Sequence, residues 1–188
     1  MNPPERTLKK IERPSVEGPI RLNLGGRDTS IPGFVTVDLR PGPTVGILAD
    51  ISDLSMFQDG EVTEIYASNC LEHFYLTQTL GVLKEWRRVL KPGGKCFISV
   101  PDLMASIKLV QLEPTAMWPI YLLYGDQEDP LNFHYINFTY PYLAKLCVDA
   151  GFSDVKRITD MPYGLADASA YMDNKYGIPI SLNVEATA

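Results

Sequence analysis

The segment from residue 22 to residue 38 constrains this chain most, because it holds two strand patterns with almost nothing between them. Residues 20–24 alternate apolar and polar side chains, and residues 34–38 are rich in β-forming types. The glycine pair Gly25-Gly26 directly follows the first pattern. A parallel crossover normally takes a dozen or more residues. If the two strands are parallel, the helix that usually joins such strands is therefore reduced to a turn.

The end of the second strand pattern carries a carboxylate, Asp38. A glycine turn after one strand and an acidic residue after the next are typical of sites that bind a nucleotide and its ribose hydroxyls. Two plainer interpretations compete with this one. Gly25 and Gly26 can serve the turn for conformational reasons alone, and Asp38 can be a carboxylate that caps the strand end. The segment by itself does not choose between them.

Composition indicates a single globular domain, residues 1–188, with 45% hydrophobic and 21% charged residues. A net charge of −6 argues against non-specific binding to nucleic acid or to an anionic membrane surface. The three cysteines have no metal-ligand spacing, so we predict buried core thiols in a reducing compartment and no metal site. No secretory signal or membrane-spanning run is visible, and we expect a cytoplasmic protein.

The remaining pattern alternates strands and helices after an extended N-terminal arm, residues 1–19. Further strands are predicted at residues 45–49, 64–68, 95–100, 155–158 and 178–184. A helix is predicted through residues 76–90, stopped by Lys91-Pro-Gly-Gly94, and another at 140–150. Residues 104–124 are apolar and helical in pattern, broken by Pro114 and Pro119. The charges between Lys84 and Lys95 are interpreted as a solvated helix face.

Residues 118–142 hold an unusual concentration of aromatic side chains, eight of the nineteen in the chain. So dense a cluster exceeds what a connecting segment needs. We predict that residues 103–138 form a cap over a substrate pocket. A contact with a second copy of the chain in a homodimer and a satellite aromatic core are the alternatives.

Two sequence motifs, together with the distance between them, resemble those of a known family. They are Ala67-Ser-Asn-Cys-Leu-Glu-His-Phe74 and Glu85-Trp-Arg-Arg-Val-Leu-Lys-Pro-Gly-Gly-Lys95. With the glycine turn, they make the chain resemble the class I S-adenosylmethionine-dependent methyltransferases over residues 20–152. The resemblance implies an α/β Rossmann-like fold with a mostly parallel seven-stranded sheet, an antiparallel last strand and reduced first helices. It also implies S-adenosylmethionine as cofactor and methyl transfer to oxygen or nitrogen of a small-molecule acceptor, such as a saccharide or other metabolite.

The same resemblance assigns cofactor roles by position. Gly25 and Gly26 would line the methionine part, Asp38 would bind the ribose hydroxyls, and Leu39 would lie beside the adenine. Asp50 would accept from the adenine amino group while Ile51 flanks its ring. Asn69 and Leu71 would lie beneath the sulfonium. For Asp50, which precedes Ile-Ser-Asp, helix capping is the competing role.

Arg27 departs from the family pattern, which usually has glycine at this third position of the turn. A side chain here can crowd the cofactor, or its guanidinium can bind the cofactor's carboxylate. Both possibilities remain open at the level of the sequence.

Only two histidines, His73 and His134, are available as general bases for an acceptor. His73 follows the fourth strand, where bracing the next helix is its alternative role. His134 lies within the aromatic segment, where a structural hydrogen bond is the alternative. Two rival functions are a non-catalytic binding or scaffold protein with this fold and a nicotinamide-dependent oxidoreductase. The second is disfavoured, because no third glycine follows and no helix can start at the turn.

Overall fold

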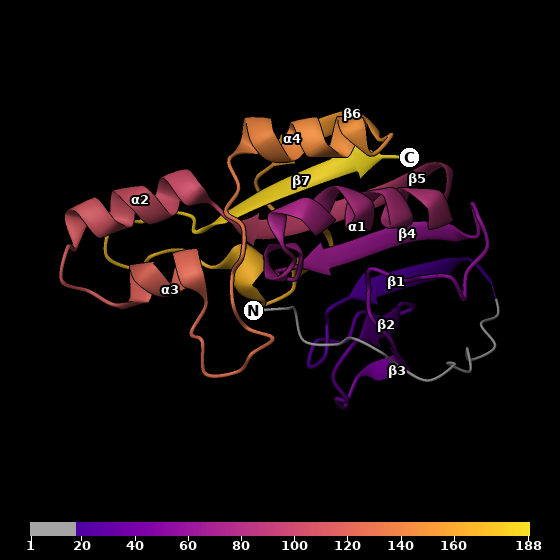
Figure 1. Ribbon diagram of the computed structural model, residues 1–188, viewed down its shortest axis with the longest axis horizontal. Helices are drawn as coiled ribbons and strands as arrows, with labels where there is room; N and C mark the ends of the chain where they lie inside the picture. The colour runs from indigo at the N-terminus through magenta and orange to yellow at the C-terminus, as the bar shows by residue number, and fades with distance from the viewer. Residues whose placement is uncertain (1–17) are drawn as a thin grey trace.

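The computed structural model describes residues 18–188, so the predicted N-terminal arm lies almost entirely outside the described residues. The described chain forms one seven-stranded sheet with helices beside it (Figure 1). Its strands are β1 (Ile20–Leu24), β2 (Val35–Asp38), β3 (Val45–Leu48), β4 (Val62–Ser68), β5 (Leu90–Pro101), β6 (Ser153–Ile158) and β7 (Ser181–Thr187). Its α-helices are α1 (Leu76–Val89), α2 (Leu103–Leu112), α3 (Trp118–Tyr124) and α4 (Tyr140–Asp149).

The strand order is β3-β2-β1-β4-β5-β7-β6. Strands β1 to β5 pair in parallel, whereas β7 runs antiparallel to both β5 and β6. The predicted fold class, a mostly parallel seven-stranded sheet with an antiparallel last strand, is therefore confirmed. The order reverses beside β1, so the carboxyl ends of β1 and β4 border the crevice where open α/β sheets bind ligands.

The first two crossovers are turns, as predicted: residues 25–34 and 39–44 are all described, and no helix lies within them. The two turns hold each other in place through Thr44. Its hydroxyl lies 2.9 Å from the carbonyl oxygens of both Gly26 and Arg27, where it can donate to either. The Gly25 N–H donates to the Val37 carbonyl at 2.9 Å, which fixes the start of the glycine turn against β2.

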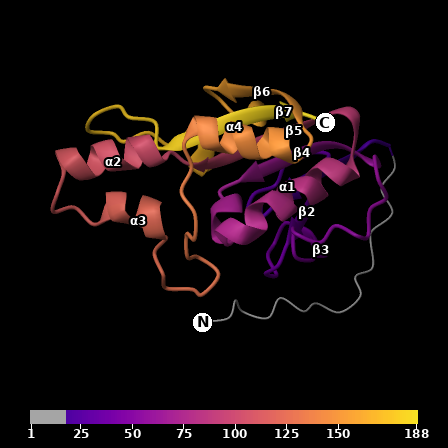
Figure 2. The same cartoon turned by 45° about the horizontal axis from the view of Figure 1, so that its top comes forward.

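Helices α1 and α4 lie side by side on one face of the sheet, as both views show (Figures 1 and 2). They cover the apolar side chains of that face, including Leu22, Val37, Ile65 and Ile98, all essentially inaccessible to solvent. Burying a large aliphatic side chain contributes about 1.5–3 kcal/mol, so this face supplies most of the core energy. The predicted core thiols are also buried: Cys70, Cys96 and Cys147.

The second motif ties α1 to the loop between β3 and β4. Glu85 accepts from the Leu54 N–H at 2.9 Å, and Trp86 Nε1 donates to the Ile51 carbonyl at 2.9 Å. Arg88 donates to Glu85 and to Asp59, each at 2.7 Å. The interpretation of these charges as a solvated helix face is therefore wrong for Glu85 and Arg88. Their partners are loop groups that the linear pattern cannot reveal.

The segment of residues 103–138 leaves the sheet and returns to it at one point. Asp102 and Phe138 form a β-bridge there, and the Leu103 N–H donates to the Phe138 carbonyl at 2.9 Å. Between these ends, α2 and α3 pack together and project beyond the carboxyl end of β5 (Figure 1). Pro119 was predicted to break a helix, and this prediction is wrong. The residue occupies the first turn of α3, where its missing N–H costs nothing.

The other helices and strands begin and end within a few residues of their predicted bounds, except β5. That strand begins at Leu90, immediately after α1, and so includes the glycine pair expected to precede it. In the described part of the chain, every helix is too short or too polar to cross a membrane.

Candidate functional site

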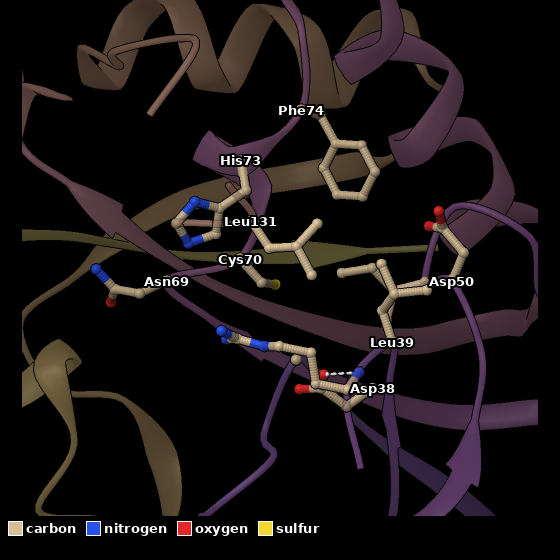
Figure 3. A pocket seen from close by; sticks show the side chains of 11 residues that line it. Asp38, Leu39, Asp50, Asn69, Cys70, His73, Phe74 and Leu131 are labelled. Carbon is tan, nitrogen blue, oxygen red and sulfur yellow. Dashed lines mark hydrogen bonds between the residues drawn. The ribbon is translucent and has the colours of Figure 1, made fainter. Parts of the chain in front are cut away.

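A pocket of about 520 Å³, including the part open to solvent, lies beyond the carboxyl ends of β1, β2 and β4. Its wall is made by eleven residues: Gly25, Asp38, Leu39, Arg40, Asp50, Ile51, Asn69, Cys70, His73, Phe74 and Leu131. In Figure 3 the carboxylates of Asp38 and Asp50 border one part of the pocket, and His73 and Asn69 border another. Seven of the residues predicted from the sequence thus meet in one place.

Gly25 is required by the packing around the pocket. Its φ of +72° is a conformation that L side chains rarely adopt, and an added Cβ would lie 2.6 Å from Cys70 Cβ. Gly26 is required for a different reason, because a Cβ there would lie 2.0 Å from the side-chain amide nitrogen of the buried Asn23. Gly26 is not among the residues that line the pocket, so only Gly25 combines the steric role with a position in the wall.

Asp38 is buried, and two backbone N–H groups orient its carboxylate. The Arg40 N–H donates to Oδ1 at 2.8 Å, and the Arg27 N–H donates to Oδ2 at 3.2 Å. The capping role considered as an alternative is therefore real. It does not exclude ligand binding, because each carboxylate oxygen can accept a second hydrogen bond and the residue lines the pocket.

The Arg27 side chain does not line this pocket. It is bonded to Asp28 instead, with Nε donating to Oδ2 at 2.8 Å, and it is 39% exposed. In this conformation Arg27 neither crowds the pocket nor reaches into it. Its contribution to the site is the backbone N–H that holds Asp38.

Asp50 also combines a wall position with a local capping role. Its Oδ1 accepts from the Ser52 N–H at 2.9 Å and from the Ser52 hydroxyl at 2.7 Å. Ile51 also lines the pocket, and Trp86 Nε1 donates a hydrogen bond to its carbonyl oxygen. The motif on α1 therefore acts on the pocket indirectly, by fixing the loop that carries Asp50 and Ile51.

The first motif forms a one-turn 3-10 helix, η1 (Leu71–His73), directly after β4. Asn69 precedes it with a φ of +49° and lines the pocket. Leu71 is fully buried and lies outside the pocket wall, as core packing rather than ligand contact requires. Residues 103–138, the predicted cap segment, contact this turn, since the Tyr135 N–H donates to the Glu72 carbonyl at 2.9 Å.

The two histidines meet edge to face, with ring centroids 5.1 Å apart. His73 Nδ1 lies 3.1 Å from the Phe133 carbonyl, and His134 Nδ1 lies 3.0 Å from the Leu122 carbonyl. Burial lowers the pKa of His73 to about 4, opposed in part by backbone hydrogen bonds to Phe133 and Asn69. Burial lowers the pKa of His134 as well, so both rings are neutral near pH 7.

Arg40, Leu131 and Glu72 were missed by sequence reasoning. Arg40 lines the pocket and pairs with Asp129 of the cap segment at 2.9 Å, next to the wall residue Leu131. Glu72 lies beside the histidine pair with its carboxylate buried. A signal existed only for Glu72, which belongs to the first motif. The Arg40–Asp129 contact joins segments far apart in the chain.

Comparisons with known proteins agree with this architecture. The family described as "Methyltransferase domain" matches residues 32–98, which include β2 to most of β5 and begin after the glycine turn. A SAM-dependent methyltransferase structure from Archaeoglobus fulgidus is similar at 15% identity and a TM-score of 0.59, covering 92% of this chain and 87% of that one. A comparison with curated proteins returned no significant match.

Two further solved structures share the fold. A SAM-dependent methyltransferase from Methanosarcina mazei has a TM-score of 0.57 at 16% identity, covering 89% of this chain and 91% of that one. The Burkholderia thailandensis 1,6-didemethyltoxoflavin-N1-methyltransferase, solved with S-adenosylhomocysteine, has a TM-score of 0.54 at 18% identity, covering 89% and 70%. The chain therefore has the fold of these S-adenosylmethionine-dependent methyltransferases, and residues 32–98 match the methyltransferase-domain family.

Proposed function

We propose that this chain binds S-adenosylmethionine in the pocket beside Asp38 and transfers its methyl group to oxygen or nitrogen of a small molecule. The observation that carries the proposal is the meeting of Gly25, Asp38, Asp50 and Asn69 in one pocket at the switch point of the sheet. These residues come from four separate segments. Their convergence is what a nucleotide-type cofactor needs and what core packing alone does not require.

The cofactor's polar groups have matching partners along the wall. The Asp38 carboxylate, already oriented by two backbone N–H groups, would accept from the ribose hydroxyls. Leu39 and Ile51 provide apolar contact for the adenine ring, and Asp50 can accept from its amino group. Gly25 would give the methionine part access to the backbone, because no side chain stands there. Asn69 would lie nearest the sulfonium.

Methyl transfer requires little from the protein beyond positioning and water exclusion. An acceptor lone pair attacks the methyl carbon in line, and the carbon–sulfur electron pair leaves with sulfur as S-adenosylhomocysteine. A hydroxyl or amine acceptor must also lose its proton. His73, neutral and in the pocket wall, is the base that we assign, with His134 packed against its ring as the second candidate.

The cap segment supports a small acceptor. Residues 103–138 contribute Leu131 to the pocket, and the Arg40–Asp129 ion pair joins this segment to the pocket wall. A cap that closes over the site limits the size of what enters. A saccharide or another small metabolite is the acceptor class that we propose.

The experiment is a transfer assay with S-adenosylmethionine labelled in its methyl group and pools of small hydroxyl- and amine-bearing metabolites. The proposal expects S-adenosylhomocysteine and a labelled product in equal amounts. Binding of S-adenosylmethionine without transfer to any pool would favour the alternative, a non-catalytic member of the fold. Thermal protection by NAD but not by S-adenosylmethionine would favour the oxidoreductase instead.

A further inference from the structure

We propose that Glu72, His73 and His134 form a binding site for one divalent transition-metal ion of the zinc, cobalt or iron class, at the wall of the cofactor pocket. Each residue offers one ligand atom, and these atoms all lie within 4.8 Å of one another. Two imidazoles and one carboxylate are the donor set of several catalytic zinc and non-haem iron sites.

The Glu72 carboxylate is the first observation that points to a cation. The side chain is 1% exposed, and neither oxygen has a hydrogen bond of good geometry to any residue that the structure describes. Burial raises its pKa to about 8, and the nearby Asn69 amide offsets this only in part. A buried carboxyl group without partners is costly to a fold unless something binds it. A cation held between this carboxylate and the histidines would remove that cost.

The histidine tautomers are the second observation. A carbonyl oxygen can only accept, so Nδ1 of His134 donates to the Leu122 carbonyl, and Nδ1 of His73 can donate to the Phe133 carbonyl in the same way. In a neutral ring the lone pair then lies on Nε2. Metal-binding histidines in proteins share this arrangement, in which the other ring N–H donates to a backbone carbonyl and fixes the orientation of the ring.

The elements that carry the three ligands are held together by the backbone. The Tyr135 N–H bonds to the Glu72 carbonyl, and the His134 N–H bonds to the Tyr124 carbonyl at 3.1 Å. The ligands of one zinc ion lie about 3.4 Å apart in a tetrahedral site, somewhat closer than here. Binding would therefore require small changes in side-chain torsion angles that bring the ligand atoms about an ångström closer.

The position of this metal site gives the ion a task in the proposed methyl transfer. His73 belongs to the pocket wall, so an ion on this residue adjoins the space where an acceptor would lie. The ion would occupy the lone pairs of both histidines, so with metal bound neither ring is the base. The ion would instead lower the pKa of an acceptor oxygen at one of its open positions. This task rests on the proposed function, whereas binding of the metal does not.

Metal binding is tested with chelator-treated protein in the absence of S-adenosylmethionine, so failure here leaves the proposed function untouched. Co²⁺ is titrated and followed by its visible absorption, then displaced with Zn²⁺. We expect Co²⁺ to bind at one site, from which Zn²⁺ displaces it. Mg²⁺ at the same concentration should not displace it, because Mg²⁺ avoids imidazole ligands. Absence of saturable Co²⁺ binding at millimolar concentration would overturn the proposal, and so would displacement by equal Mg²⁺.

Variants separate this site from adventitious binding. Glu72→Gln and His134→Asn should each weaken Co²⁺ binding roughly tenfold or more. The control, Glu128→Gln, changes an exposed acid on the same cap segment and should leave the affinity unchanged. Wild-type affinity in both ligand variants would overturn the proposal.

A readout on the wild-type protein covers the case in which those variants fail to fold. The chain has two histidines, so its imidazole ¹⁵N spectrum contains four ring nitrogens. Zn²⁺ should shift the Nε2 signals of both rings and leave both Nδ1 nitrogens protonated. Unshifted Nε2 signals at saturating Zn²⁺ would contradict the assignment.

Discussion

Gly25 and Cys70 face each other so closely that a Cβ added at Gly25 would lie 2.6 Å from Cys70 Cβ. The contact joins the turn after β1 to the residue after Asn69, and both residues line the pocket. Steric fit between the two turns therefore shapes the floor of the pocket. The glycine serves packing and ligand access at once.

Gly25→Ala should lower the free energy of unfolding by about 2–4 kcal/mol, since it adds left-handed strain to an overpacked contact. The matched control is Gly81→Ala, within α1, where a Cβ meets nothing within 4 Å. It should stabilise by about 0.5–1 kcal/mol. Urea unfolding measures both. Equal stability of Gly25→Ala and wild type would mean that the turn is not packed as described.

Arg27→Ala should leave the affinity for S-adenosylhomocysteine within about twofold of wild type, because only its backbone N–H contributes to the site. Isothermal titration calorimetry measures the change. A tenfold loss would show that the guanidinium leaves Asp28 and binds the cofactor's carboxylate. A tenfold gain would mean that the side chain crowds the site.

Glu85→Ala should destabilise the fold by roughly 2–3 kcal/mol, because Leu54 N–H loses its acceptor and Arg88 loses a partner. Lys84→Ala, its exposed neighbour on α1, should change stability by less than about 0.5 kcal/mol. Thermal unfolding with circular dichroism compares the two. Equal effects would mean that the second motif does not hold the loop that carries Asp50 and Ile51.

The stability of metal-free protein should fall as pH rises from 6.5 to 8. Burial raises the pKa of Glu72 from 4.5 to about 8 and lowers that of His73 from 6.5 to about 4. Below pH 6.5 the two effects oppose each other, because unfolding takes up a proton at His73 and releases one from Glu72. Above pH 6.5 the unfolded histidines lose their protons as well, so release from Glu72 increasingly outweighs uptake at His73 and His134. Proton uptake by the histidines and the half-titration of Glu72 near pH 8 keep the slope below the one-proton limit of about 1.4 kcal/mol per pH unit, so stability falls by roughly 1 kcal/mol over this range.

Glu72→Gln tests this pH dependence, since glutamine does not titrate and keeps the shape of the side chain. Its free energy of unfolding in chelator should not fall between pH 6.5 and 8, because only proton uptake by the histidines remains. Cys70 and Arg40 also lie near this cluster and are unchanged in the variant. The same slope in wild type and variant would assign the pH dependence to another group.

The sheet and its trimmed crossovers could be predicted from the sequence because their signals are local. Alternation in residues 20–24 and the short distance to Asp38 leave few topologies. Most of the pocket was also predictable, since residues that end parallel strands meet at one edge. The family resemblance supplied the assignment of Asp50 and Ile51, which local pattern alone did not.

Contacts between distant segments account for what the sequence did not reveal. Arg40 meets Asp129, and Glu72 meets His134, through the return of the cap segment over η1. No spacing rule links such positions, so no metal site was predicted. Glu85 and Arg88 appeared solvated for the same reason, because their partners lie in a loop that precedes the helix.

Direct binding of the cofactor tests the central claim. S-adenosylmethionine is titrated calorimetrically into wild type, Asp38→Ala and the control Asp28→Ala, whose carboxylate is exposed and lies outside the pocket. We predict one saturable site in wild type and Asp28→Ala, weakened by about 1–3 kcal/mol in folded Asp38→Ala. No binding to wild type at millimolar S-adenosylmethionine, or equal affinity in Asp38→Ala, would contradict the account.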